Sequence, residues 1–329
     1  MHSVSYGRSP LSELFKHLSV LRARGANLLW NIITFSNRLV ELRLQSINGY
    51  DSESFDFLQA PNSAPELRDL KIISVISFPD RFSDSPPPSP KPIKCPIPKL
   101  QTLLLEDLGY NVLQIIQNAV GPGTYQTTLR LDEKATHIHV PRQQPEIVGV
   151  KDLCKVLKCI NVGKLVLQGE WQGKMWFEPS GLHSVLESLP ALKPLIMSDW
   201  KFRKDDLLAL ARPRPVKKTS TKAFPKLTEL YVENAQMLDI EPLRNIVTSH
   251  SLQKWSLSGC VAPPPDVNDS GSDDDDDVSK DNKNNSGDEF KDALGWHYFG
   301  NNDTIIKWLK SKVALFHLGD VSSTESKGY

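Results

Sequence analysis

The sequence predicts an α/β solenoid in which eight or nine irregular repeats stack a curved parallel sheet on the inside and helices on the outside. Two observations predict it. An apolar-x-x-apolar-x-apolar pattern recurs through the first 260 residues, and its copies begin at intervals of 25 to 36 residues. Between copies, apolar residues recur every three or four positions, which is typical of amphipathic helices. One such unit cannot bury its apolar face alone, so its neighbours must stack on it.

The pattern predicts a short strand in every copy. Residues two apart in a strand point to the same side, so the second and third apolar slots face the core and the residue between them faces out. The copies are Leu39-x-x-Leu42-x-Leu44, Leu67-x-x-Leu70-x-Ile72, Leu100-x-x-Leu103-x-Leu105, Gln126-x-x-Leu129-x-Leu131, Val162-x-x-Leu165-x-Leu167, Leu192-x-x-Leu195-x-Met197, Leu227-x-x-Leu230-x-Val232 and Leu252-x-x-Trp255-x-Leu257, with a degenerate earlier copy at Leu18-x-x-Leu21-x-Ala23.

Helices are predicted between the strands, and proline marks where several of them end. Apolar residues at helical spacing include Leu113, Ile116 and Val120; Leu182, Val185, Leu186 and Leu189; and Leu243, Ile246 and Val247. Pro65, Pro98, Pro190 and Pro225 each stand just before a strand copy. Proline cannot continue a helix and favours extended backbone in the residue before it. Each unit is therefore expected to run strand, loop, helix, proline, strand.

These spacings and flanks resemble the leucine-rich repeats of the ribonuclease-inhibitor-like type, and in particular the long, irregular repeats that follow the F-box in fungal F-box proteins. The resemblance covers about residues 10–260. Residues 10–18 echo the opening line of an F-box, and no complete F-box is recognisable before the repeat at Leu39. The Asn or Cys that often follows the strand in tight leucine-rich repeats is mostly missing. The resemblance implies substrate recruitment for a cullin-type ubiquitin ligase, with the target on the concave sheet and an adaptor held elsewhere.

Four segments lie outside the regular pattern of the predicted array at 1–261. Residues 79–98 contain eight prolines and predict an extended loop insertion. Residues 262–290 are strongly acidic and almost without apolar side chains, so we expect a disordered insert. Residues 291–318 return to core-like composition and predict a C-terminal cap, with Asp303 before a helix. Residues 319–329 are expected to be a disordered tail.

Composition narrows the partner classes. The chain has 39 Lys and Arg residues against 39 Asp and Glu, and its mean hydropathy is -0.33. This balance argues against a general nucleic-acid or membrane partner, and no stretch reaches the roughly 18 apolar residues of a membrane-spanning helix. Four cysteines show no disulfide or zinc spacing, which is typical of a reducing compartment. We therefore expect a cytoplasmic or nuclear chain that is a monomer by itself.

No motif in the sequence indicates catalysis or binding of a cofactor or metal. The sequence contains no Gly-x-Ser-x-Gly elbow, phosphate-binding loop, Gly-x-Gly-x-x-Gly turn or His-Glu-x-x-His helix. His137 and His139 form the one pair with a metal-like spacing, and no further ligand is placed beside them by a motif. We therefore predict neither an enzyme nor a bound cofactor or metal, although a catalytic domain without a recognised motif stays a remote alternative.

The outward positions of the predicted sheet offer a surface for a protein partner. Apolar and aromatic side chains beside arginine are the usual composition of a protein-binding centre. The candidate partner-binding residues are Leu104, Arg130, Val166, Ile196 and Tyr231 on strands, with Trp171 and Trp200 on nearby loops. In a competing interpretation, loop insertions cover these residues or the aromatic rings belong to the core. The sequence thus favours a protein-recognition scaffold, as a ligase substrate receptor or as a binding or inhibitor protein with no ligase attached.

Overall fold

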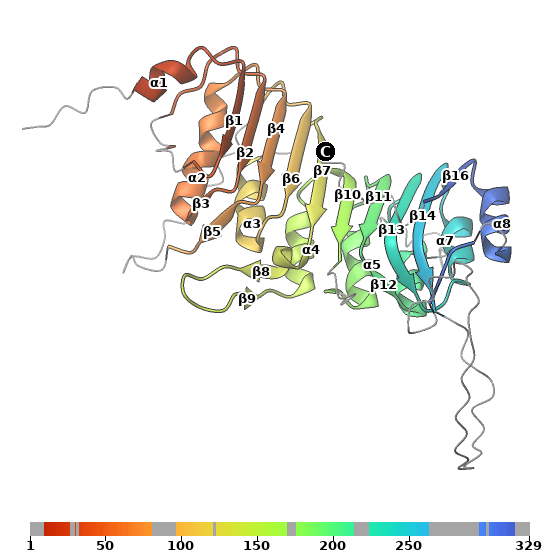
Figure 1. Ribbon diagram of the computed structural model, residues 1–329. Helices are drawn as coiled ribbons and strands as arrows, with labels where there is room; N and C mark the ends of the chain where they lie inside the picture. Colours follow the sequence, from red (N-terminus) through yellow and green to blue (C-terminus); the bar gives the residue numbers. More distant parts are fainter. Residues whose placement is uncertain are drawn as a thin grey trace, which may run out of the picture.

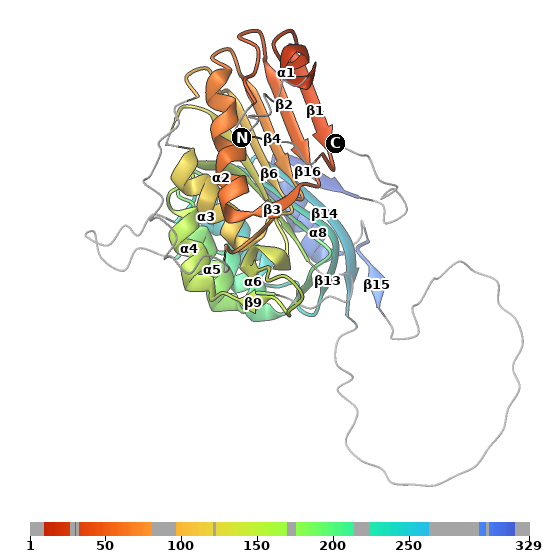
Figure 2. The ribbon, with the colours of Figure 1, turned by 90° about the vertical axis from the view of Figure 1, so that its left-hand side faces the viewer.

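The computed structural model describes residues 10–26, 30, 33–80, 97–120, 123–169, 176–213, 224–262, 296–300 and 303–319. They form an α/β fold in which helices line one face of a 12-stranded sheet (Figures 1 and 2). The predicted acidic insert beyond residue 262, most of the Pro-rich insertion and nearly all of the tail lie outside the described residues. No described helix is long and apolar enough to cross a membrane.

The main sheet is parallel over almost its whole length, and its principal strands follow one another in chain order. These strands are β1 (Val20–Arg24), β2 (Glu41–Gln45), β4 (Asp69–Ile73), β6 (Thr102–Glu106), β7 (Gln126–Leu131), β10 (Val162–Gln168), β11 (Pro194–Ser198), β13 (Glu229–Met237), β14 (Lys254–Val261) and β16 (Leu315–Leu318). Two short strands extend the sheet at the C-terminal ends of β13 and β14. β12 (Lys201–Phe202) pairs with β13 in parallel, and β15 (His297–Tyr298) pairs with β14 in antiparallel orientation. Parallel neighbours need a crossover connection between them, which the helices supply.

The helices contact one another in chain order along the covered face. They are α2 (Asp51–Gln59), α3 (Tyr110–Ala119), α4 (Val150–Leu157), α5 (Pro179–Glu187), α6 (Lys204–Leu210), α7 (Leu243–Ser249) and α8 (Thr304–Lys312), with the short α1 (Pro10–Phe15) before β1 and the 3-10 turns η2 (Ala60–Ser63) and η3 (Glu133–Thr136). The three helices expected from apolar spacing are α3, α5 and α7, and their apolar stripes are buried. Two small sheets pair β3 (Asn48–Tyr50) with β5 (Ile76–Phe78) and β8 (His137–Ile138) with β9 (Glu146–Ile147).

The core contains the apolar slots that the sequence pattern places there. From the Leu39 copy onward, no second-slot or third-slot side chain is more than 2% exposed. In the degenerate first copy, Leu21 and Ala23 are half-buried and pack against the same core. The predicted burial of the second and third slots is therefore confirmed in the strands that carry the copies, β2, β4, β6, β7, β10, β11, β13 and β14.

One copy of the pattern, on β7, pairs with the preceding strand β6 in a register that differs from the slot-to-slot match of the other copies. With second slots side by side, Leu129 would lie beside Leu103, but Leu129 pairs with Leu105, and Thr127 occupies the place beside Leu103. The Thr127 methyl can fill an inward position, and this side chain is buried while Gln126 is exposed. A bulge between Val162 and Lys164 then restores the match with the next strand. As a result, side-chain rows on the exposed face shift by two residues between β6 and β7.

A left-handed residue recurs two residues beyond the third apolar slot, just after the shorter strands and within the longer strands β13 and β14. The φ angle lies between +51° and +62° at Gly25, Ser46, Ser74, Asp107, Asp199 and Asn234, and it is +135° at Gly259. The Ser46 and Asp199 N–H groups donate to carbonyls of the following strand, Ile73 at 3.0 Å and Glu233 at 3.0 Å. Gly, Asn and Asp tolerate this conformation best. The recurring signal is thus a small or polar residue at a fixed offset, which a search for Asn or Cys alone misses.

The C-terminal segment adds β15 and β16 to the sheet, with α8 between them. Asp303 precedes α8 as predicted, but its carboxylate accepts a hydrogen bond from the Gly300 N–H at 2.8 Å instead of from a helix N–H. Ile305, Ile306 and Leu309 of α8 are buried against the core. β16 then pairs in parallel with β14.

Candidate protein-binding face

The face of the main sheet opposite the helices carries the outward side chains of every strand. In Figure 2 the helices α2 to α5 lie on one side of the ribbon and the strands of the main sheet on the other. No described helix covers the strands β7 to β14 on this outward side (Figures 1 and 2). The outward side chains of these strands, such as Arg130, Val166 and Ile196, are half-buried or exposed, which makes this face the candidate binding surface.

Four of the candidate residues form one continuous line across the strands. Arg130 is the register partner of Val166, Val166 of Ile196, and Ile196 of Tyr231. We call Arg130, Val166, Ile196 and Tyr231 the central row. Neighbouring strands lie about 4.8 Å apart, so the row spans about 14 Å. Leu104 is not part of it, because the register shift places Leu104 beside Thr128 and brings Glu106 beside Arg130.

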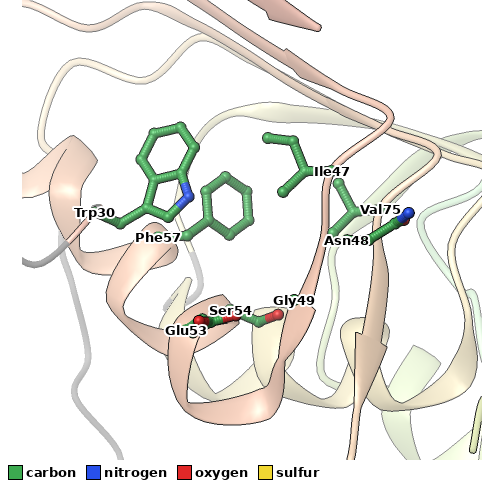
Figure 3. A pocket seen from close by; sticks show the side chains of 8 residues that line it. All are labelled: Trp30, Ile47, Asn48, Gly49, Glu53, Ser54, Phe57 and Val75. Atoms are coloured by element: carbon green, nitrogen blue, oxygen red, sulfur yellow. The ribbon is translucent and has the colours of Figure 1, made fainter. Parts of the chain in front are cut away.

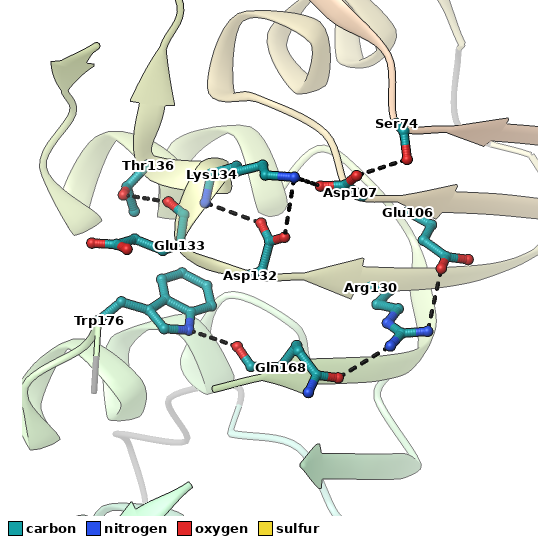
Figure 4. A network of polar contacts seen from close by, with 10 residues as sticks. All are labelled: Ser74, Glu106, Asp107, Arg130, Asp132, Glu133, Lys134, Thr136, Gln168 and Trp176. Carbon is teal, nitrogen blue, oxygen red and sulfur yellow. Dashed lines mark hydrogen bonds and ion pairs between the residues drawn. The ribbon is translucent and has the colours of Figure 1, made fainter. Parts of the chain in front are cut away.

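Arg130 is held at one end of the central row by two neighbours. Its guanidinium donates to Glu106 Oε1 at 3.2 Å and to Gln168 Oε1 at 3.1 Å (Figure 4). The backbone carbonyl of Gln168 in turn accepts a hydrogen bond from Trp176 Nε1 at 3.0 Å. Exposed ion pairs of this kind contribute at most about 1 kcal/mol to stability. The pair therefore orients Arg130 without withdrawing its charge from solvent.

Tyr231 closes the other end of the row. Its hydroxyl donates to Glu229 Oε2 at 2.6 Å, and Lys254 Nζ lies 5.2 Å from the ring centroid. Partial burial of the ring and the neighbouring Glu229 carboxylate raise the pKa of Tyr231 above its ordinary value. The side chain therefore stays a neutral donor and presents its ring beside Ile196.

One of the two tryptophan candidates, Trp200, is not part of this surface. Trp200 is 1% exposed, and its Nε1 donates to the Leu167 carbonyl at 2.9 Å, so the prediction that it contacts a partner is wrong. It directly follows the left-handed Asp199, where the chain turns inward, and the equivalent Val75 and Leu108 are buried in the same way. Trp171 lies outside the described residues.

A polar network lies beside the row at the register shift. Asp107 Oδ2 accepts a hydrogen bond from the Ser74 hydroxyl at 2.7 Å, and Lys134 Nζ lies 2.5 Å from Asp107 and 4.0 Å from Asp132 (Figure 4). Burial opposes ionisation of Asp107, but hydrogen bonds from Lys134 and Ser74 outweigh it and hold its pKa below the ordinary value. Burial, reinforced by the charge of Asp107, raises the pKa of Asp132. Sequence reasoning missed this cluster, because the register that assembles it is not a local property.

The network predicts a pH-dependent effect of removing Lys134. The Lys134→Met variant leaves Asp107 and Asp132 facing each other without their cation, so we expect it to be destabilised by less than about 1 kcal/mol at neutral pH, since Lys134 is half-exposed. The raised pKa of Asp132 means that this carboxyl takes up a proton before Asp107 does on acidification, so the deficit should shrink as the pH falls from neutral into the acidic range. Urea unfolding of the unmodified chain and of Lys134→Met, at neutral pH and at acidic pH, measures this difference in stability. A deficit that grows in acid contradicts the assignment.

Other parts of the described chain offer less for a ligand. A cavity of about 20 Å³ beside α2 has room for a single water, and it is lined by Trp30, Ile47, Asn48, Gly49, Glu53, Ser54, Phe57 and Val75 (Figure 3). His137 lies on β8 and His139 just after it, and burial lowers the pKa of His139. Across the described residues, no three His, Cys, Asp or Glu side chains are grouped so as to hold a metal ion.

Comparison of the sequence with models of known protein families and with curated proteins finds no match.

Proposed function

We propose that this chain is a leucine-rich-repeat solenoid of the ribonuclease-inhibitor-like type and that its exposed sheet face binds a protein partner. Three features support the repeat architecture. Successive strands pair in chain order, the second and third slots of successive copies are buried, and a left-handed residue recurs two residues beyond the third slot. Stacked repeats of this kind build an extended surface that contacts partners through outward side chains.

The central row is the observation that carries the binding function. Val166 and Ile196 are apolar side chains on the outward face, and they are only half-buried by their neighbours. Arg130 and Tyr231 flank them, and both residue types are enriched among residues that dominate binding energy. An apolar centre with a polar surround is the usual anatomy of a protein–protein interface.

The test is a charged substitution in the centre of the row. We expect Ile196→Asp to weaken binding of the cellular partner at least about tenfold, because a carboxylate would be desolvated in the interface. The matched control is Ile147→Asp, since Ile147 is 80% exposed on β9, away from the row. Both variants and the unmodified full chain are cross-linked in cells and the captured proteins quantified, with circular dichroism confirming the fold. A partner retained equally by all three contradicts the proposal.

We further propose that the chain recruits substrates to a cullin-type ubiquitin ligase in the cytoplasm or nucleus, as its resemblance to F-box proteins implies. The observation that favours an adaptor contact is α1, where Leu14 is 53% exposed at the N-terminal end of the sheet. We expect Leu14→Asp to lose the ligase adaptor in co-purification while keeping the partner bound at the central row. A stoichiometric partner without any adaptor would instead identify a binding or inhibitor protein with no ligase attached.

A further inference from the structure

We infer that the partner segment seated on the central row is an amphipathic α-helix that lies across the strands, with an aliphatic stripe, one acidic flank and one basic flank. The inference rests on the proposed binding function and specifies its partner. It follows from the spacing of the row, the distance between the rows on either side, and the charges that those rows carry.

Spacing along the row matches a helix. The side chains of Val166, Ile196 and Tyr231 stand on adjacent strands, which lie about 4.8 Å apart. Along one face of an α-helix, side chains at i, i+4 and i+7 recur about every 5.4 Å. An extended segment places its same-face side chains about 6.7 Å apart, so after two positions its side chains no longer lie over the side chains of the row. The span from Arg130 to Tyr231 corresponds to fewer than three helical turns.

The width of the surface also suits a helix. Two residues from the central row toward the strand starts lie Lys164, Pro194 and Glu229, and two residues toward the strand ends lie Gln168, Ser198 and Glu233. These two bordering rows are four residues apart along each strand, or about 13 Å. A helix with its side chains is about 10–12 Å across, so its flanks would lie over the bordering rows while its stripe contacts the centre.

The bordering rows differ in charge. Toward the strand starts, Lys164 and Lys254 are exposed, and the intervening Glu229 accepts the hydrogen bond from the Tyr231 hydroxyl. Toward the strand ends, Glu233 is exposed and Asp132 lies 4.0 Å from Lys134 Nζ, and the outward positions between these two carboxylates are Gln168 and Ser198. Complementary charge sets the register of an interface and excludes wrong partners. A helix with acidic residues on one side of its stripe and basic residues on the other satisfies both borders.

The probes are three synthetic peptides of about 18 residues and identical charge composition, measured by fluorescence anisotropy with the full chain. The first has leucines at i, i+4, i+7 and i+11, with glutamates on one flank and lysines on the other. The second mixes the charges between flanks, and the third replaces one central residue of the first with proline, which breaks the helix. We expect the first peptide to bind at least about tenfold more tightly than the others, and Ile196→Asp but not Ile147→Asp to abolish the difference.

Charge-swap variants test the flanks. We expect Lys164→Glu and Glu233→Lys each to weaken the first peptide several-fold. The double variant should bind more tightly than either single variant, because the same helix can turn end to end and present its flanks to the exchanged charges, while the unchanged Lys254 and Asp132 keep the recovery partial. Equal binding of the proline peptide, no binding of the first peptide, or single swaps without effect would each overturn the helix assignment. If capture of the cellular partner depends on Ile196 despite such a result, the proposed binding face is supported and only the helical partner is excluded. If capture of the partner does not depend on Ile196, both proposals are excluded.

Discussion

Replacing Gly259 with alanine is expected to lower the free energy of unfolding by about 4 kcal/mol, at the upper end of single-residue effects. Gly259 has a φ of +135°, a conformation that L-residues with a side chain rarely adopt. A Cβ atom there would lie 1.9 Å from the Ala235 carbonyl oxygen and 2.6 Å from the Ala235 nitrogen. Both contacts are with backbone of the paired strand, so relief requires β13 and β14 to separate locally.

Thermal unfolding followed by circular dichroism measures this effect. For a domain of this size we expect a fall in Tm of about 8–16 °C. Gly25→Ala is the matched control, because Gly25 is also left-handed at the end of a strand, with φ of +61°, but no atom lies within 4 Å of a Cβ placed on it. Its cost should be about 1 kcal/mol, from the backbone conformation alone. Equal unfolding midpoints for the two variants would show that the close approach at Ala235 is not as described.

The His250→Phe variant is expected to lose about 3 kcal/mol of stability. His250 is buried and joins two units of the array: its Nδ1 accepts a hydrogen bond from the Leu227 N–H at 3.2 Å, and its Nε2 lies 2.9 Å from the Leu210 carbonyl. These contacts require a neutral ring with its proton on Nε2. Phenylalanine fills similar volume but leaves a buried N–H and a buried carbonyl unpaired, each costing about 1–3 kcal/mol. Urea unfolding at neutral pH gives the difference.

The same variant reports a pH dependence with a definite sign. Burial lowers the pKa of His250 below its ordinary value of 6.5, with Arg212 adding to the shift and the Leu210 hydrogen bond opposing it. Below pH 6.5 and above the folded-state pKa, the unfolded chain binds more protons than the folded chain. The stabilisation from neutral His250 is therefore complete above pH 6.5 and declines as the pH falls through that window.

We accordingly expect the stability difference between the unmodified chain and His250→Phe to be smaller at about pH 5 than at about pH 7.5. His183→Ala is the control, since His183 is half-exposed, its Nδ1 lies 3.3 Å from the Ala209 carbonyl, and its cost should stay below about 1 kcal/mol. A difference between the unmodified chain and His250→Phe that is constant across the pH range would exclude the neutral, doubly hydrogen-bonded ring.

The sequence predicts the inward and outward alternation well and the lateral alignment less well, for a physical reason. Alternation is local: Leu195 and Met197 are buried and Ile196 faces out because neighbouring side chains in any strand point to opposite sides. Alignment is decided by pairing between strands. Thr127, a β-branched polar residue in an apolar position, does not match the repeat pattern and so hides the shift that separates Leu104 from the central row.

Trp200 shows a second limit. A tryptophan after a polar residue at a strand end is compatible with either an exposed loop or the core, and composition alone does not distinguish them. What decides is the left-handed turn at Asp199, which directs the next side chain under the sheet. The outward direction of the four central-row side chains could be predicted, because each residue lies between two inward slots of its own strand. These residues are Arg130, Val166, Ile196 and Tyr231.

Each main strand pairs with the main strands that come before and after it in the chain, and this has a consequence for how the sequence can diversify. The main strands obtain their hydrogen bonds from the strands on either side, and the outward residues of any one strand take no part in the packing underneath. Substitutions at those positions are therefore nearly neutral for folding and can accumulate one strand at a time. If this face binds a partner as proposed, its specificity can change one strand at a time while the buried leucines stay the same.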